Sequence, residues 1–197
     1  ELVNGWAEFQ DAKTVKVGKG KDALIIEGEN VILANGSVPI ELPFMKYGNN
    51  VISSREALSL SELPEHVVVV GGGYIGLELG ITYKMLGSDV TIVEAEDSIL
   101  PIFDKELRRP LELFVKKNKI KVNTGVFAKG VEDTKDGKTK LFFIDKNAKE
   151  GTKPEEILAD KILVTVGRKP NSDALKPTGV ALNDRGFVKV NDRCETN

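Results

Sequence analysis

A run of four valines, Val67–Val70, leads directly into a glycine triplet. An apolar strand with no polar alternation is typical of a parallel sheet that is covered on both faces. The glycines are followed by Leu77–Leu86, a segment of helical composition, and then by a second apolar run, Asp89–Glu94. These segments form a β-α-β unit of about 30 residues. The chain is therefore expected to contain an α/β domain built around a parallel sheet.

The glycines follow the spacing Gly71-x-Gly73-x-x-Gly76, between the first strand and the helix. In a dinucleotide-binding loop, the first glycine permits a tight turn, the second lets the backbone approach a pyrophosphate, and the third lets helix and strand pack closely. The helix start then offers unpaired N–H groups to the phosphates. The spacing alone is weak, but its strand–helix setting makes it informative. The residues expected to hold the pyrophosphate are Gly71, Gly72, Gly73, Tyr74, Ile75 and Gly76.

An acidic residue, Glu94, closes the second strand 23 positions after Gly71. A carboxylate at this position accepts hydrogen bonds from the hydroxyls of a ribose. It repels a 2′-phosphate, and the following residues 95–98 contain no arginine to accommodate one. These features predict NAD rather than NADP. The alternative is a strand–helix turn next to a surface glutamate.

Further elements are expected on both sides of this unit. Asp104 is a plausible helix N-cap, and Pro110 is expected to kink or weaken the helix that follows. Asp136-Gly137 indicates a hairpin. Two strands are expected within 23–34, and single strands near 5–9, 14–17, 120–126, 130–134, 139–145 and 161–166. A short helix is expected over 53–63 and a second helix over 104–118.

The composition excludes several classes of function. The formal net charge of −2 gives no reason to expect a nucleic-acid partner. No apolar run approaches the roughly 20 residues of a membrane span. Cys194, the single cysteine, excludes an internal disulfide and favours a reducing, cytoplasmic setting. No metal-ligand spacing is present. The start at Glu1, without an initiator Met or a signal-peptide profile, predicts an internal fragment.

Three segments, VVVVGGGYIGLELG, VTIVE and ILVTVGRKPN, resemble the pyridine-nucleotide-disulfide oxidoreductases, and among these the dihydrolipoamide dehydrogenases. The resemblance covers essentially the whole chain, including VNGWAEF, ILANGSVPIELP and CETN. It implies a Rossmann-like NAD-binding domain with a parallel sheet and a β-meander, plus part of a discontinuous FAD-binding domain. The expected limits are 1–63 for the partial FAD-binding domain, 64–170 for the NAD-binding domain and 171–197 for a return segment.

The same resemblance assigns roles to individual residues. Glu94 contacts the adenosine ribose, Val126 the adenine region and Gly167 the bound nucleotide, while Glu78 lies near the nicotinamide. Gly5, Gly36 and Ser37 match positions that touch FAD. Alternative interpretations remain: turn formers at Gly36 and Ser37, a helix-surface carboxylate at Glu78, a core valine at Val126 and a strand-end glycine at Gly167.

The family reaction implies that dihydrolipoamide reduces NAD⁺ through a redox dithiol and FAD. The dithiol comes from a CxxxxC motif, and a His–Glu pair moves the proton. This chain has one cysteine and one histidine, His66, and Asn35 replaces the usual Thr of the family's ATGS element. No catalytic residue is therefore assigned, and the chain is expected to bind NAD(H) weakly and to turn over no lipoamide. In the full-length enzyme the resemblance implies a lipoyl-bearing protein partner and a homodimer, formed by a domain that is absent here.

Two alternatives remain open. The chain could also come from an NADH oxidase or mercuric reductase-like flavoprotein, which shares the nucleotide-binding domain. Only the N-terminal redox motif, which this chain lacks, would distinguish such a protein from a dihydrolipoamide dehydrogenase. A non-catalytic NAD-sensing module is a candidate from a different class. The GRxPN element, Gly167 to Asn171, and the flavin-domain flanks argue against that module.

Overall fold

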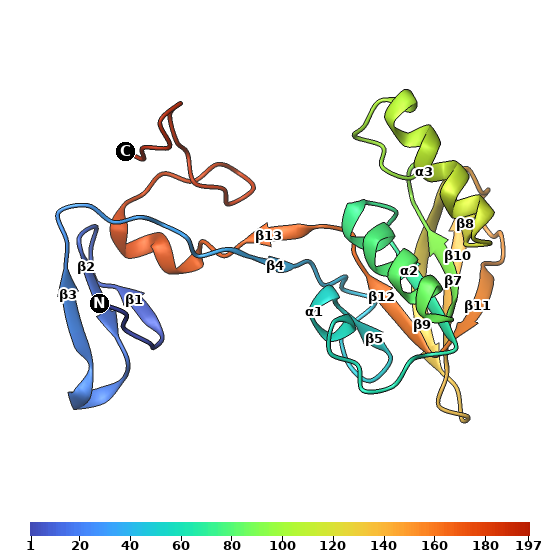
Figure 1. Cartoon of the computed structure of the whole chain (residues 1–197), viewed down its shortest axis with the longest axis horizontal. Coiled ribbons are helices and arrows are strands. Elements are labelled where there is room, and N and C mark those ends of the chain that lie inside the picture. Colours follow the sequence, from blue (N-terminus) through green and yellow to red (C-terminus); the bar gives the residue numbers. More distant parts are fainter. The chain divides into compact units, whose positions relative to one another are not determined.

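The computed structural model describes residues 1–197, which form two compact units (Figure 1). Unit 1 comprises Glu1–Val38 and Arg168–Asn197, and unit 2 comprises Pro39–Gly167. Residues 39–63, which the sequence groups with the preceding segment, belong to unit 2. They do so because Met45, Val51 and Ile52 are buried in its cores.

Unit 2 is built on a five-stranded sheet in which every neighbouring pair is parallel. The carboxyl ends of all five strands consequently lie at one edge of the sheet. This sheet confirms the expected α/β class. In spatial order its strands are β5 (Val51–Ile52), β12 (Lys161–Val164), β6 (His66–Val70), β7 (Asp89–Val93) and β8 (Lys121–Asn123).

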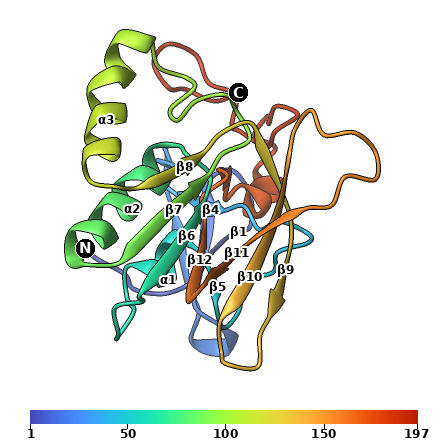
Figure 2. The same cartoon turned by 90° about the vertical axis from the view of Figure 1, so that its right-hand side faces the viewer.

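The valine run of β6 is buried on both faces of the sheet. Val67 and Val69 lie in one core with helix residues such as Leu77, and Val68 and Val70 lie in a second core with Leu141 and Phe143. The resulting three layers are helices, parallel sheet and antiparallel sheet (Figure 2). The helical layer contains α2 (Tyr74–Leu86) and α3 (Lys105–Lys117), and the antiparallel layer contains β9 (Val126–Asp133), β10 (Thr139–Asp145) and β11 (Glu155–Ala159).

The boundaries of the helices follow their capping residues. Gly87 ends α2 with a φ of 118°, and its N–H donates to the carbonyls of Tyr83 and Lys84. A reciprocal capping box between Ser53 and Glu56 starts α1 (Ser54–Ala57), which is much shorter than the helix expected over 53–63. It ends early because the N–H groups of residues 58 and 59 bond to carbonyls three residues back, tightening the last turn.

Helix α3 begins after Asp104, as expected, although the Asp104 side chain makes no capping hydrogen bond. The helix continues through Pro110. Because proline has no N–H, the carbonyl of Glu106 lacks its usual helical donor there. None of the helices has the length and apolar character needed to cross a bilayer.

The strand expected over 120–126 is wrong at its carboxyl end. β8 stops at Asn123, and Val126 opens β9 in the other sheet. Gly125 lies between the two strands with a φ of 67°, the left-handed conformation that turns the chain from one sheet to the next.

Unit 1 contains an antiparallel sheet of β1 (Ala7–Phe9), β2 (Thr14–Val17) and β3 (Leu24–Glu27), joined between β2 and β3 by a 3-10 turn, η1 (Gly20–Asp22). A two-stranded sheet pairs β4 (Ser37–Pro39) with β13 (Arg168–Pro170), and η2 (Asp173–Thr178) is a second 3-10 helix.

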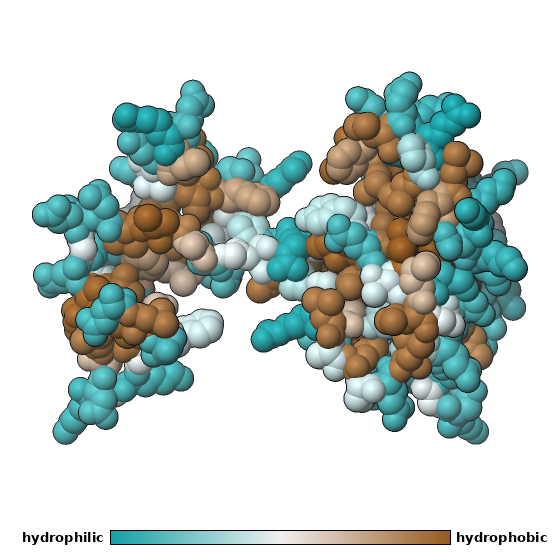
Figure 3. All heavy atoms as spheres, in the orientation of Figure 1, coloured by the Kyte–Doolittle hydropathy of each residue, from teal (hydrophilic) through white to brown (hydrophobic).

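The expectation of two strands within 23–34 is wrong. β3 is the edge of its sheet and no neighbouring strand pairs with residues 31–34, so the second apolar run has no ladder to join. Ile32 is 93% exposed, and Trp6, Leu24 and Ile25 are also exposed. Figure 3 shows such apolar side chains at the surface of this unit.

Candidate nucleotide-binding site

The glycine loop lies at the point where the strand order of the parallel sheet reverses. The chain moves from β6 to β7 and then to β8 on one side, whereas β12 and β5 lie on the other side of β6. In open parallel sheets, ligands bind beyond the carboxyl ends of the strands at such a switch point. The loop after β6 is therefore at the position where this fold forms a binding crevice.

Two of the loop glycines are required by packing within the loop. Gly71 has a φ of 109°, and a Cβ built there would lie 2.7 Å from the carbonyl oxygen of Thr165. A Cβ on Gly76 would lie 2.1 Å from the carbonyl oxygen of Gly71 and 2.6 Å from Oγ1 of Thr165. No side chain fits at either position, so the strand and the helix approach each other closely here.

Gly73 has different surroundings. It is the N-cap residue of α2, and a Cβ built on it would meet no atom within 4 Å. The helix start has no side-chain capping bond, so no side chain occupies the N–H groups of Tyr74, Ile75 and Gly76. The start of α2 thus has open space beside Gly73 and no side chain bonded to its first amides, an arrangement that suits a phosphate group.

Glu94 follows β7 and is only 8% exposed. Its Oε2 accepts a hydrogen bond from the N–H of Gly72, and its Oε1 accepts one from the N–H of Glu96 at 2.8 Å. Each carboxylate oxygen retains a further acceptor position. The carboxylate is therefore fixed against the glycine loop and can still accept hydroxyl donors.

Val126 and Gly167 are brought to the same edge of the sheet. The N–H of Val126 donates to the carbonyl of Glu94 at 3.0 Å. Gly167 follows β12 with a φ of 138°, and its carbonyl accepts the N–H of Ile40 at 3.0 Å. Glu78 lies one turn into α2 and is exposed.

The residues expected to touch FAD all lie in unit 1. A Cβ on Gly5 would lie 2.6 Å from Cγ1 of Val17, so close packing already requires glycine there. Gly36 has a φ of 70° and open surroundings. Oγ of Ser37 accepts a hydrogen bond from Nε of Arg168 at 2.7 Å, and the Ser37 carbonyl accepts another from the same guanidinium.

Several residues that support the loop were missed from the sequence. The hydroxyl of Thr165 donates to the carbonyl of Gly71 at 3.0 Å, and the N–H of Leu100 donates to the carbonyl of Gly72 at 2.9 Å. Ile99 packs beneath Gly72, where a Cβ would lie 3.1 Å from its Cγ2. Thr165 had a signal, since it is the one hydroxyl residue within the apolar run 162–166.

An arginine also reaches the loop after Glu94. Arg108 of α3 donates from its guanidinium to Oγ of Ser98 and, at 3.5 Å, to the carbonyl of Ile99. Residues 95–98 therefore contain no arginine themselves, but an arginine from α3 contacts this segment in the folded chain. The sequence could not show this contact because ten residues separate Arg108 from Ser98.

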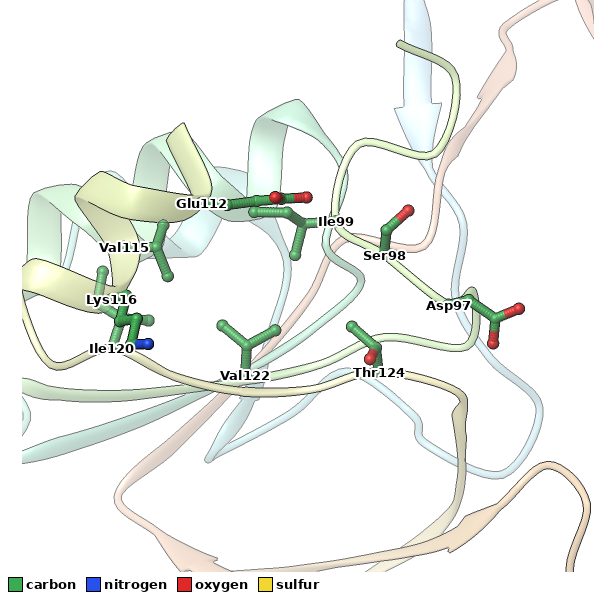
Figure 4. A pocket seen from close by; sticks show the side chains of 9 residues that line it. All are labelled: Asp97, Ser98, Ile99, Glu112, Val115, Lys116, Ile120, Val122 and Thr124. Atoms are coloured by element: carbon green, nitrogen blue, oxygen red, sulfur yellow. The ribbon is translucent and has the colours of Figure 1, made fainter. Parts of the chain in front are cut away.

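A cavity of about 410 Å³ lies between α3, β8 and the loop after β7 (Figure 4). Val115, Ile120 and Val122 supply apolar surface, while Asp97, Glu112 and Lys116 carry charge. None of the residues expected to hold the nucleotide lines it. The complete lining is Asp97, Ser98, Ile99, Glu112, Val115, Lys116, Ile120, Val122 and Thr124.

The single histidine and the single cysteine are not among the residues of this edge. His66 starts β6, at the strand end opposite to the glycine loop, with Nδ1 2.8 Å from the Leu158 carbonyl and Nε2 2.9 Å from Oγ1 of Thr91. Cys194 is exposed in unit 1.

Comparison with known proteins gives consistent matches over the whole chain. The family described as "Pyridine nucleotide-disulphide oxidoreductase" matches residues 1–197. A dihydrolipoyl dehydrogenase of Geobacillus stearothermophilus is 42% identical over 198 residues, and one of Bacillus subtilis (strain 168) is 40% identical over 200. Each match covers 100% of this chain and 41% of the relative, so the chain spans about two fifths of their length.

Solved structures give the same answer about the fold. The HOCl-induced flavoprotein disulfide reductase RclA from Escherichia coli matches 100% of this chain and 43% of its own chain. The TM-score is 0.82 at 25% sequence identity. Together with the sheets described above, this match confirms the expected fold class.

Proposed function

The chain belongs to the pyridine nucleotide-disulphide oxidoreductase family, and we propose that it forms the NAD(H)-binding part of a flavoprotein of the dihydrolipoyl dehydrogenase type. In this proposal unit 2 (Pro39–Gly167) holds the NAD-binding domain, and unit 1 contributes to an FAD-binding domain. The relatives that are named dihydrolipoyl dehydrogenase, at 40–42% identity, support this choice.

One observation carries the proposal: an uncapped, open helix start lies next to a buried carboxylate. Gly73 leaves space over the N-terminus of α2, and Glu94 is held against Gly72. A diphosphate needs N–H donors and positive potential, and the adjoining ribose needs an acceptor. The start of α2, after β6, meets the first requirement, and Glu94, after the neighbouring parallel strand β7, meets the second.

The residues of this chain then have separate tasks. Gly71, Gly72, Gly73, Tyr74, Ile75 and Gly76 supply the turn and the helix amides for the pyrophosphate, and Glu94 accepts the hydroxyls of the adenosine ribose. Val126 contacts the adenine region and Gly167 the nucleotide, while Glu78 lies near the nicotinamide. NAD⁺, when bound, supplies a hydride acceptor, and FAD supplies the redox step that precedes it. Gly5, Gly36 and Ser37 are assigned to FAD.

The complete enzyme would oxidise dihydrolipoamide, on a lipoyl-bearing protein, and reduce NAD⁺. It would act as a homodimer. A second candidate is a flavoprotein reductase with another substrate, which the structural match to RclA supports. A purely NAD-sensing module is disfavoured, because the family match extends through residues 1–197 and includes unit 1.

Titration of the folded chain with NADH, followed by nicotinamide fluorescence, tests the proposal. Saturable binding is expected, and circular dichroism of the same sample shows that it is folded. A folded sample without affinity for NADH would overturn the nucleotide-binding assignment.

A second experiment tests whether this chain alone lacks the activity of the proposed complete enzyme. The isolated chain is expected to show no dihydrolipoamide-dependent NAD⁺ reduction, because its single cysteine cannot form the redox dithiol. It is also expected to show no near-stoichiometric flavin absorbance band, because it holds only part of the proposed FAD-binding domain. A complete dihydrolipoyl dehydrogenase serves as positive control in the same assay. Turnover by the chain would contradict the fragment interpretation.

A further inference from the structure

The cavity between α3, β8 and the loop after β7 has walls made from the protein core (Figure 4). Ile99, Val115 and Ile120 are buried members of one hydrophobic core. Ile99 is also supported from behind, because it packs beneath Gly72. Val122 of β8 completes the apolar surface. The volume of about 410 Å³ falls within the range of small-ligand sites, which is roughly 300 to 1,000 Å³.

One charged group of this cavity, the Glu112 carboxylate, has no partner in the protein. The residue is partly buried, and its carboxylate forms neither an ion pair nor a hydrogen bond. Figure 4 shows its side chain extending from α3 toward Ile99. Arg108 and Lys116 lie one helical turn before and after it, the spacing at which oppositely charged residues usually pair. Because neither of them pairs with it, a partly buried carboxylate is left without a counter-charge, which is unfavourable.

The other charges near the cavity are engaged or lie in solvent. The guanidinium of Arg108 donates to the loop after β7 rather than to a carboxylate. Asp97 forms an ion pair with Lys146. Lys116 is exposed, and in Figure 4 it lies at the end of the cavity opposite to Asp97. Glu112 is therefore the covered charge that remains to be balanced.

We propose that this cavity binds a small organic ammonium ion, whose cation pairs with Glu112 and whose compact apolar group packs on Val115, Ile120 and Val122. Each half of such a ligand answers one feature of the cavity. The carboxylate gains a charge-assisted hydrogen bond, and the apolar walls gain from the burial of further apolar surface. No residue assigned to the nucleotide lines the cavity, so this inference does not depend on the proposed NAD(H) site.

The test titrates the whole chain with phenethylammonium and follows the backbone amide signals by NMR. Hydrocinnamate, an anion of similar size, and uncharged phenethyl alcohol are the comparison probes. Phenethylammonium is expected to bind with a dissociation constant of about 1 mM, a strength typical of a ligand of this size. Both comparison probes should bind about fivefold more weakly or less, because they cannot pair with a carboxylate. Equal binding of the three probes would overturn the proposal.

Glu112→Gln keeps the length of the side chain and removes its charge. This variant should bind phenethylammonium about fivefold to tenfold more weakly than the wild type. Glu106→Gln is the matched control, because it removes the same charge from the first turn of the same helix, outside the cavity. It should bind the probe like the wild type. An equal loss in both variants would mean that net charge alone attracts the probe, and an unchanged affinity in Glu112→Gln would remove Glu112 from the site.

Lys116→Gln separates an ammonium site from a site for an anion or a zwitterion. Removal of this cation should leave the affinity for phenethylammonium unchanged or raise it up to about twofold, because a competing positive charge is gone. Weaker binding of phenethylammonium in Lys116→Gln, or tighter binding of hydrocinnamate than of phenethylammonium by the wild type, would contradict the proposed ligand class.

Val122→Phe tests the location, because the added ring fills the apolar part of the cavity. A folded variant, checked by circular dichroism, should bind phenethylammonium more than about tenfold more weakly. In the wild type the amide shifts should centre on Ile99, Val115, Ile120 and Val122, which locates the probe even if Val122→Phe does not fold. Amide shifts centred elsewhere, or wild-type affinity in folded Val122→Phe, would overturn the proposal and leave the proposed NAD(H) site standing.

Discussion

Gly72 donates its backbone N–H to Oε2 of Glu94, a residue 22 positions later in the chain. This bond joins the loop after β6 to the residue after β7. Because it accepts this bond, the buried Glu94 carboxylate positions the glycine loop as well as offering an acceptor for ribose. Glu94, the residue proposed to recognise the ribose, therefore also holds the glycine loop in place.

Glu94→Ala is expected to reduce the affinity for NADH about tenfold or more, because it removes a charged acceptor from both the ribose and the Gly72 N–H. The preference for NADH over NADPH should narrow as well, since the charge opposing a 2′-phosphate is gone. Fluorescence titration with both nucleotides measures the two effects. Glu65→Ala, at the opposite end of β6, is the control, and an unchanged NADH to NADPH ratio in Glu94→Ala would remove Glu94 from its assigned role.

Gly73→Ala is expected to weaken NADH binding about tenfold while changing the free energy of unfolding by only about 1 kcal/mol. The added methyl meets no protein atom but occupies the space proposed for the pyrophosphate. Titration and urea unfolding measure the two quantities. Gly130→Ala, on β9 with equally open surroundings, should bind NADH like the wild type. Wild-type affinity in Gly73→Ala would place the pyrophosphate elsewhere.

Gly76→Ala is expected to destabilise the fold by about 3 kcal/mol, since the methyl would overlap the Gly71 carbonyl and force the strand and helix apart. Urea denaturation measures the loss. Gly80→Ala is the comparison on the same helix, because its Cβ would make ordinary contacts at 3.4 and 3.5 Å with Val69 and Val90. That variant should be neutral or slightly stabilising. Equal effects of the two substitutions would contradict the packing argument.

The stability of α1 should depend on pH through Glu56. A hydrogen bond from the Ser53 hydroxyl is the main cause that lowers the pKa of Glu56 below 4.5, with the Ser53 N–H adding to it against desolvation. A lowered carboxyl pKa contributes stability above the unfolded value of about 4.5, and this contribution is lost as pH falls through the folded pKa. Glu56→Gln should therefore destabilise the chain at neutral pH, with a difference from wild type that shrinks in acid.

Urea unfolding of wild type and Glu56→Gln across this pH range measures the difference. Glu62→Gln, on the exposed loop after α1, is the charge-matched control. A difference between wild type and Glu56→Gln that stays constant with pH would show that the capping bond is independent of the carboxylate charge.

Local patterns were sufficient for the central unit. The valine run, the glycine spacing and Gly87 predicted a strand, a loop and a helix, and β6, α2 and β7 confirm them. The reason is that these patterns act over a few residues: β-branched side chains favour buried strands, and glycine permits backbone angles and approaches that other residues do not.

Patterns that depend on distant partners were not readable in the same way. Residues 31–34 have strand composition but no neighbouring strand, and Val126 belongs to a different sheet from β8. Whether a strand forms depends on pairing, and pairing partners can lie anywhere in the chain. The sequence likewise gave no sign that Arg108 reaches Ser98.

The sequence by itself determined the β-α-β unit, the glycine positions and the acidic residue after the second strand, because each rests on local backbone and side-chain requirements. Only the tertiary structure decided that Thr165 supports Gly71, that Glu94 binds Gly72, and that Asp97 meets Lys146 from 49 residues away. Those contacts arise because parallel strands place their carboxyl ends at one edge, whatever their separation along the chain.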